Sequence, residues 1–272
     1  MLEKQDIFRQ KGVTIITMKV LSKLILMLQF FTRIPININV KASTEDFAKG
    51  LIYAPVIGLF IGLILAAASY GLSFILPASV SAVLIIVIYI IITGGLHLDG
   101  LGDTFDGIFS NRPKDRILEI MRDSRVGTNA VLAVFCVLLV DYSVLSQLYS
   151  DKYFLFIVVF MPVAGRIGSI LGASVSVYAR AEEGLGKSFI DYCGKKEFLK
   201  GLLIYVLISA GLFVCGFEFD VKMVILLAIP PVSAVLMVKA FSGKIGGATG
   251  DILGAVCELN QTAFLLFACA LI

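Results

Sequence analysis

Residues 94–107 read GGLHLDGLGDTFDG, and this stretch decides how the rest of the chain is interpreted. Its carboxylates Asp99, Asp103 and Asp106 are spaced i, i+4 and i+7, which places them within roughly 60° on one face of a helix. Three anions so close repel one another by roughly 1 kcal/mol per pair in water, and by more where water is scarce. A hard divalent cation such as Mg²⁺ would compensate this charge, because it prefers oxygen ligands. We therefore predict a metal site on this helix face.

A second acidic pair, Glu119 and Asp123, repeats the i, i+4 spacing one segment later. Arginines lie between and around these acids, at positions 112, 116, 122 and 125. Carboxylates that hold Mg²⁺ together with arginines that bind phosphate are typical of phosphoryl transfer. The alternative is a solvated helix with ordinary ion pairs. Only 16% of the chain is charged, yet eleven charged residues fall between 99 and 125, which favours the metal–phosphate interpretation.

The whole chain has the composition of an integral membrane protein. Of its 272 residues 58% are hydrophobic, and the mean hydropathy is +0.96, whereas soluble domains are about 45–50% apolar. The apolar runs approach 20 residues and do not alternate, so helices are the expected spanning element. A net charge of +3 says little about nucleic acid, but the chain carries no RNA- or DNA-binding motif, so no nucleic-acid partner is expected. We expect an all-α, polytopic transmembrane helix bundle.

The apolar runs predict about seven spans plus an N-terminal interfacial or re-entrant helix. The expected spans are 50–76, 79–96, 128–149, 153–175, 199–217, 222–241 and 251–272. The run 18–36 is short and has basic flanks, so we expect it to lie at the membrane surface and to end at Pro35. Residues 18–272 then form one membrane domain, and 1–17 form an extension, disordered or from a misassigned start, with no function assigned. Glycines of the first span are expected to be packing positions: Gly50, Gly58, Gly62 and Gly71.

Basic residues predict the orientation of these spans. If the loops 98–126, 176–200 and 242–250 share one side, that side and its span ends hold twelve Lys and Arg residues against two on the other. The side with more basic residues is normally cytoplasmic. A non-spanning helix at 18–36 also keeps the basic N-terminal residues there. We therefore expect a multi-pass protein of the cell's inner or plasma membrane with cytoplasmic active-site loops.

Two further loops on that side carry polar groups. The segment 178–187 contains charges and glycines, and a plain turn between spans is the equal alternative. In the segment 243–251, four glycines and Thr249 precede a helix, where free backbone N–H groups bind phosphate. It is not a Walker loop, and the alternative is a capped helix start whose small residues pack. Asp251, next in this segment, is acidic at membrane depth and hence a functional candidate.

Three isolated signals remain. Arg166 lies inside an apolar run, so it needs either a buried carboxylate partner or a substrate. His97 is the only histidine, and it either acts as a base near Asp99 or is simply hydrogen-bonded. The five cysteines show no disulfide or zinc spacing, and the four that lie in apolar runs are expected to behave as small hydrophobic residues.

Several stretches together are similar to the cobalamin synthase family, whose members are adenosylcobinamide-GDP ribazoletransferases. They are FFTRIP (30–35), APVIG (54–58), GGLHLDGLGDTFDG (94–107), EIMRDSRVGT (119–128), YARAEEGLG (178–186) and GGATGDILGA (246–255). They occur in order from about residue 18 to the C-terminus, and members of this family typically begin near Met18. The long central motifs make this resemblance specific.

The resemblance implies a reaction. The ribose hydroxyl of α-ribazole, or of its 5′-phosphate, attacks the cobinamide-linked phosphate of adenosylcobinamide-GDP, and GMP leaves. Adenosylcobalamin or its 5′-phosphate forms with Mg²⁺ as cofactor. The implied partners are these substrates and the lipid bilayer, with no nucleic acid; a homo-oligomer or contact with other enzymes of cobalamin synthesis is left open.

The matching motifs, read with the chemistry above, give the candidate site residues. As catalytic residues we expect Asp99, Asp103, Asp106, His97, Arg122 and Arg125. As metal ligands we expect Asp103 and Asp106, completed or supported by Glu119, Asp123 and Asp99. As substrate-binding residues we expect Arg33, Arg166, Arg180, Glu183, Gly247, Thr249 and Asp251.

A second, weaker resemblance is to the D-x-x-D-G…D-x-x-x-D pattern of CDP-alcohol phosphotransferases. The A-R that follows D-G there is missing, Arg112 lies one position late, and Glu119 replaces an aspartate, which argues against a phospholipid substrate. A secondary transporter is the rival from another class, because Arg166, Asp251 and glycine-interrupted helices are transporter-like. No inverted repeat supports it, and a non-catalytic scaffold would not explain the clustered acids.

Overall fold

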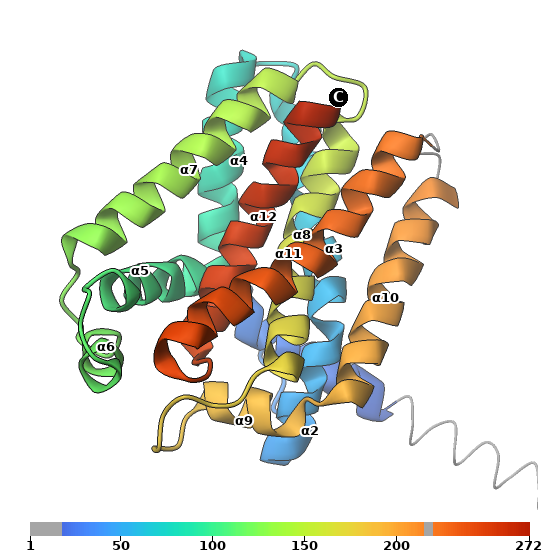
Figure 1. Cartoon of the computed structure of the whole chain (residues 1–272). Helices are drawn as coiled ribbons and strands as arrows, with labels where there is room; N and C mark the ends of the chain where they lie inside the picture. The colour runs from blue at the N-terminus through green and yellow to red at the C-terminus, as the bar shows by residue number, and fades with distance from the viewer. Residues whose placement is uncertain (1–17, 215–219) are drawn as a thin grey trace, which may run out of the picture.

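The computed structural model describes residues 18–214 and 220–272, and these form an all-α bundle (Figure 1). The segment 1–17, for which we expected an extension, lies outside the described residues. Residues 18–31 are helical, and the other elements in chain order are α2 Thr44–Lys49, the 3₁₀ turn η1 Gly50–Tyr53, α3 Ala54–Leu72, α4 Ala78–Thr93, α5 Leu96–Ile108, α6 Lys114–Ile120, α7 Thr128–Leu148, α8 Phe154–Val175, α9 Leu185–Tyr192, α10 Lys195–Val214, α11 Val221–Ile245 and α12 Gly250–Leu271. In this part of the chain the extended pairing is limited to one bridge, between Tyr178 and Ala248.

Six of these helices are long and apolar enough to cross a membrane, and a seventh crossing results if α4 and α5 are counted as one span. The bend between α4 and α5 is 92°, so only α4 runs along the bundle (Figure 1). With 16 residues α4 is about 24 Å long, somewhat shorter than the hydrocarbon thickness of about 30 Å. The predicted polytopic bundle is confirmed, with α5 turning out of it.

Helix α8 forms the centre of the bundle, with α3, α10, α11 and α12 around it. Glycines allow the closest of these contacts. A Cβ atom at Gly62 of α3 would overlap the carbonyl oxygen of Val159, and one at Gly58 would lie 2.6 Å from the carbonyl oxygen of Pro162. The packing role expected of these two glycines is confirmed. It is wrong for Gly71, whose added Cβ would meet nothing within 4 Å.

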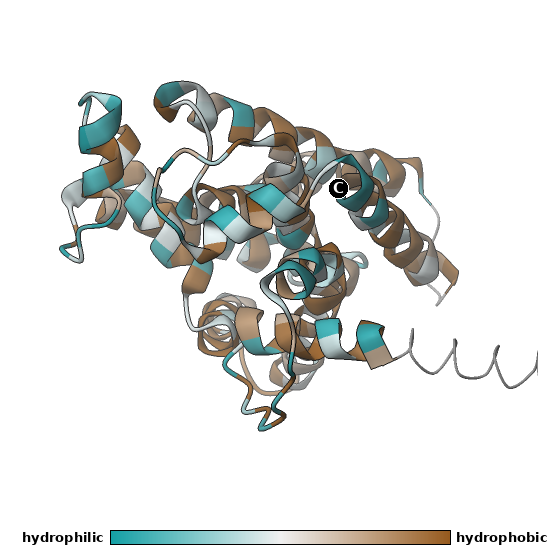
Figure 2. Ribbon diagram, turned by 90° about the horizontal axis from the view of Figure 1, so that it is seen from below, coloured by the Kyte–Doolittle hydropathy of each residue, from teal (hydrophilic) through white to brown (hydrophobic). Residues whose placement is uncertain are grey.

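The helix at residues 18–31 lies across the base of the bundle and is seen lengthwise from below (Figure 2). It ends before Pro35, contrary to expectation. The reason is that the chain leaves the helix to bond with the end of α4, where the backbone N–H of Arg33 donates to the carbonyl of Ile92 at 2.6 Å. Met27 and Phe31 bury the inner face of this helix in the core.

All short helices gather at the end of the bundle that carries this base (Figure 1). The loops 98–126, 176–200 and 242–250 meet there, as the basic residues predicted, and polar residues are frequent at this end (Figure 2). The segments 73–77 and 149–153 and the C-terminal end lie at the opposite end (Figure 1). That the loop-rich end faces the cytoplasm stays a prediction.

Candidate active site

The site begins at the turn between α4 and α5. Gly94 and Gly95 have φ angles of +64° and +69°, a left-handed conformation that glycine adopts without strain. A Cβ atom at Gly94 would also overlap the side chain of Arg33. These two glycines therefore turn the chain sharply and bring Arg33 against the start of α5.

Glycines also let α5 lie directly against the start of α12. A Cβ atom at Gly100 would lie 2.9 Å from the backbone oxygen of Asp251, and one at Gly254 would lie 3.4 Å from the Cα of His97. Because the two backbones approach so closely, Asp251 of α12 lies beside the acidic face of α5. The sequence had placed Asp251 in a separate loop cluster, and the structure joins the two clusters.

A cavity of about 1080 Å³, here called the acidic cavity, opens between α5, α7 and the loop 121–126. Its charged lining residues are Asp99, Asp103, Asp106, Asp123, Asp251, Arg33, Arg122, Arg125 and Arg180. Asp103 is close enough to Asp99, Asp251 and Asp106 to interact with them electrostatically. Carboxylate oxygens in this number are a donor set that fits Mg²⁺, and the surrounding guanidinium groups suit phosphate.

Asp106 has a second role at the start of α7. Its carboxylate accepts the backbone N–H of Gly127 at 2.6 Å and that of Ala130 at 2.9 Å. A Cβ atom at Gly127 would lie only 2.5 Å from this carboxylate, so glycine is required there. Each carboxylate oxygen accepts one of these N–H groups, so Asp106 satisfies two backbone donors that have no partner within the helix. Asp106 thus retains less capacity for a metal than Asp99 or Asp103.

The pair Glu119 and Asp123 is not on one helical face, because α6 ends at Ile120. Glu119 is 64% exposed, bonds Arg116, and is not among the residues that line the acidic cavity. Asp123 follows in a turn, lines the cavity and forms an ion pair with Arg125 at 2.6 Å. Its hydrogen bonds from Arg125 lower the pKa of Asp123 to about 2. The shared face expected from the spacing is therefore wrong.

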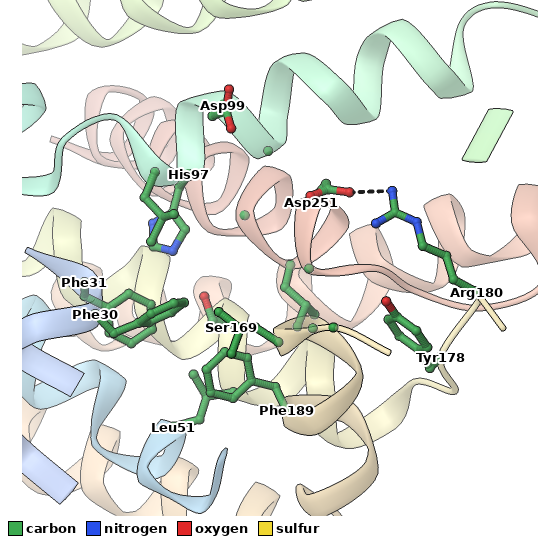
Figure 3. A pocket seen from close by; sticks show the side chains of 18 of the residues that line it. Phe30, Phe31, Leu51, His97, Asp99, Ser169, Tyr178, Arg180, Phe189 and Asp251 are labelled. Carbon is green, nitrogen blue, oxygen red and sulfur yellow. Dashed lines mark hydrogen bonds and ion pairs between the residues drawn. The ribbon is translucent and has the colours of Figure 1, made fainter. Parts of the chain in front are cut away.

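A second, smaller cavity of about 430 Å³ adjoins the first and is here called the aromatic cavity (Figure 3). Rings and aliphatic side chains form most of its wall: Phe30, Phe31, Leu51, Tyr178, Leu185, Phe189 and Leu253. Both cavities are lined by Leu96, Asp99, Arg122, Arg180 and Asp251. The two cavities are therefore adjoining parts of one site.

His97 lies in the wall of the aromatic cavity, with its Nδ1 3.7 Å from Glu258 Oε1. Ligand atoms of His97, Cys257 and Glu258 lie within 4.8 Å of one another, a grouping that the sequence spacing had not indicated. The charge of Arg166 acts on all three residues. A buried guanidinium so near disfavours a metal cation at this place.

Arg166 is fully buried in α8 and lies away from both cavities. Its Nη1 donates to the hydroxyl of Tyr89 at 2.9 Å and to Oε1 of Gln261 at 2.8 Å. Tyr89 in turn donates to Glu258 at 2.6 Å. The sequence allowed a buried carboxylate partner as an alternative to substrate contact; Arg166 instead bonds a hydroxyl and an amide, and the Glu258 carboxylate is linked through Tyr89. This network ties α4, α8 and α12 together.

The loop residues expected to bind substrate separate into two groups. Arg180 bonds Asp251 at 2.9 Å and lines both cavities, and Glu183, paired with Lys187, lines the aromatic cavity. Thr249 instead caps α12, accepting the N–H of Ile252 at 3.3 Å. Gly247 packs tightly, since its Cβ would lie 2.5 Å from the carbonyl oxygen of Val177. Neither Thr249 nor Gly247 lines the acidic or the aromatic cavity, which agrees with the alternative of a capped helix start.

The sequence interpretation missed the aromatic cavity. Its signal was the pair Phe30 and Phe31, which was noted only as part of a motif. Ser169 lies in an apolar run of α8 and gave no signal, and Phe189 is an ordinary apolar residue of the amphipathic α9. These residues meet only because α8, α9 and the 18–31 helix pack side by side.

Comparisons with known proteins show which proteins the chain is similar to. The family model for cobalamin-5-phosphate synthase matches residues 23–269. Proteins called adenosylcobinamide-GDP ribazoletransferase are similar: that of Acetivibrio thermocellus is 54% identical, covering 92% of this chain and 98% of the relative. That of Clostridium acetobutylicum is 53% identical over 90% and 94%, and that of Alkaliphilus metalliredigens is 42% identical over 91% and 94%. No solved structure matches the chain.

Proposed function

The chain belongs to the cobalamin-5-phosphate synthase family and is a transferase of cobalamin synthesis. We propose that it transfers the cobinamide-phosphate moiety of adenosylcobinamide-GDP to α-ribazole or its 5′-phosphate in a Mg²⁺-dependent reaction that releases GMP. In this reaction the ribose hydroxyl oxygen bonds to the cobinamide-linked phosphorus. The bond from that phosphorus to GMP breaks. The proton of the hydroxyl passes to a carboxylate, and GMP leaves with the negative charge.

The observation that carries the proposal is the acidic cavity, where carboxylates of α5 and α12 face four arginines. We assign Asp99 and Asp103 to the metal, with Asp106, Asp123 and Asp251 as supporting residues because each already has other partners. A bound Mg²⁺ would draw charge from the pyrophosphate and neutralise it on the leaving group.

The arginines have a separate task. Arg122 and Arg180 line both cavities, so they are placed to hold the pyrophosphate where it faces the second substrate. Each already bonds an acid, Arg122 to Glu182 and Arg180 to Asp251, both at 2.9 Å. Phosphate oxygens would share or replace these carboxylates. Asp99 and Asp251 both line the two cavities, but Asp251 is paired with Arg180, so Asp99 is the carboxylate better placed to take the hydroxyl proton.

The direct test is release of GMP by purified protein in detergent or liposomes. Release should require adenosylcobinamide-GDP, a ribazole and Mg²⁺ together. Parallel assays with α-ribazole and its 5′-phosphate will show which form is preferred. Release of GMP without any ribazole, or equal rates in excess chelator, would contradict the proposal. Movement of either substrate across the liposome without GMP release would favour the transporter instead.

A further inference from the structure

One part of the aromatic cavity combines aromatic rings with two polar side chains, His97 and Ser169 (Figure 3). Phe30 packs edge-on against Phe31 with ring centroids 4.9 Å apart, and Phe189 lies 5.4 Å from Phe30. His97 lies 5.4 Å from Phe31. Such a wall favours a flat ring system, because aromatic pairs contribute beyond their buried area.

Ser169 supplies an unused hydrogen-bonding group in this wall. The residue is 3% exposed, lines the cavity, and its Oγ has no hydrogen-bond partner within the part of the chain that the structure describes. The Cys257 thiol beside it is only a weak hydrogen-bonding group. Ser169 and His97 point into the cavity from opposite sides (Figure 3). Buried polar groups normally have good hydrogen-bond partners, so a hydroxyl in a cavity wall with at most this weak neighbour suits a ligand.

From these features we infer that the aromatic cavity binds a planar, largely apolar fused-ring base with one acceptor nitrogen, which Ser169 Oγ bonds. The inference rests on the proposed function, since this base is the base of the ribazole. Its ribose would then lie at Asp99 and Asp251, where the two cavities meet. The ribose hydroxyl would thereby face the pyrophosphate in the acidic cavity.

The other ring systems of the reaction fit less well. A volume of about 430 Å³ is at the small end of ligand sites, which span roughly 300–1,000 Å³, so a corrinoid belongs in the larger cavity. Guanine presents several donors and acceptors at its edge, and each would need a partner on burial. Beside Phe30 and Phe31 the wall places the Ser169 hydroxyl and the His97 imidazole (Figure 3), whereas Asp99, Arg180 and Asp251 lie where the two cavities meet.

The test is calorimetric binding of α-ribazole to the detergent-solubilised protein without adenosylcobinamide-GDP. Ser169→Ala should raise the Kd for α-ribazole about three- to tenfold, the usual effect of one hydrogen bond. It should leave the Kd unchanged for the matching indole riboside, which lacks the acceptor nitrogen. Ser174→Ala, on the same helix but not in the cavity wall, is the matched control and should bind both compounds like the wild type.

A second variant guards against a misleading result from one hydroxyl. Phe189→Leu keeps an apolar side chain on α9 but removes the ring, so it should raise the KM for α-ribazole and leave the KM for adenosylcobinamide-GDP unchanged. An unchanged Kd for α-ribazole in Ser169→Ala would overturn the inference, as would an equal rise in the Kd for the indole riboside. Displacement of α-ribazole by GMP, or an effect of Phe189→Leu on the KM for adenosylcobinamide-GDP instead, would overturn it too. The GMP-release assay of the wild type separates these failures from failure of the proposed function. If the wild type releases GMP normally, only the inference about the aromatic cavity is wrong; if it does not, the proposed function is wrong as well.

Discussion

At the scale of single residues, the aspartates of α5 have different surroundings despite their regular spacing. Asp103 interacts with the charges of Asp99 and Asp251 across the acidic cavity. Asp106, less than one turn further on, bonds the backbone at the start of α7. Spacing alone predicted one shared role, because a sequence shows which face a side chain is on but not which backbone meets it there.

We predict that Asp103→Asn strongly reduces catalysis without harming the fold. The change is nearly isosteric and removes one repelling anion, so the thermal midpoint without Mg²⁺ should be equal or higher. GMP release should fall by about a hundredfold or more, equivalent to about 2.7 kcal/mol of transition-state stabilisation. The rise in midpoint on adding Mg²⁺ should shrink as well, since a weaker ligand stabilises less. Wild-type rates and an unchanged Mg²⁺ response would show that Asp103 is no ligand.

Asp106→Asn should behave differently. An asparagine keeps one acceptor oxygen but turns its NH₂ group toward the second backbone N–H of α7. It also removes a negative charge from a helix start. We expect a loss of about 1–2 kcal/mol in unfolding free energy, measured by thermal or denaturant unfolding, together with reduced activity. If Asp106→Asn is as stable as the wild type yet loses its Mg²⁺ response, then Asp106 acts as a ligand rather than as a cap.

At the scale of helices, close packing of α3 on α8 depends on particular glycines. Gly62→Ala places a methyl group into the Val159 carbonyl, so the two helices must separate. Gly71→Ala, on the same helix, meets open space and gains helix propensity of roughly 0.5–1 kcal/mol. We expect Gly62→Ala to lower the thermal midpoint and the folded yield, and Gly71→Ala to leave both unchanged or raised. Equal midpoints for the two variants would mean that α3 does not pack on α8 as described.

The helices themselves were largely predictable, because apolar runs of nearly 20 residues reveal spans directly. The observed helix ends and turns differ from the predicted ones where a tertiary contact determines them. The first helix ends at residue 31 because Arg33 bonds the end of α4, and α6 ends before Asp123. The turn of 92° after α4 follows from Gly94 and Gly95, which read as ordinary loop glycines until Arg33 is seen against them. These contacts join residues far apart in the chain, and no local pattern encodes them.

At the scale of the whole molecule, the loops that carry the site all lie at one end of the bundle, and the basic residues predict that this end is cytoplasmic. Single cysteines introduced between 110 and 118 should therefore resist a membrane-impermeant thiol reagent added to intact cells, and cysteines at 151 or 152 should react. Cys136 and Cys269 are exposed, so the background must first be made cysteine-free. Permeabilised cells supply the control. The reverse pattern of labelling would invert the orientation.

The candidate site was predictable in part for the same reason as the spans. Charged residues are scarce in this chain, so the acids of 99–125 stood out, and the arginines beside them indicated phosphate chemistry. The aromatic cavity did not stand out, since Phe30, Phe31 and Phe189 resemble the other apolar residues around them. The sequence alone could not place Asp251 with the acids of α5. The two are brought together by the close packing of α5 on α12 at their glycines.

The continuity of the two cavities has a consequence for inhibitor design. Leu96, Asp99, Arg122, Arg180 and Asp251 line both, so a single compound could reach across. A bisubstrate molecule with a benzimidazole at one end and a non-hydrolysable bisphosphonate at the other would engage both cavities at once. Once one end of the compound has bound, binding of the other end is intramolecular. The affinity of the compound should therefore exceed that of either fragment by about 10²–10⁴-fold, provided that the linker matches the distance between the two binding positions. Scanning linker length would then measure, in solution, how far the base lies from the phosphates.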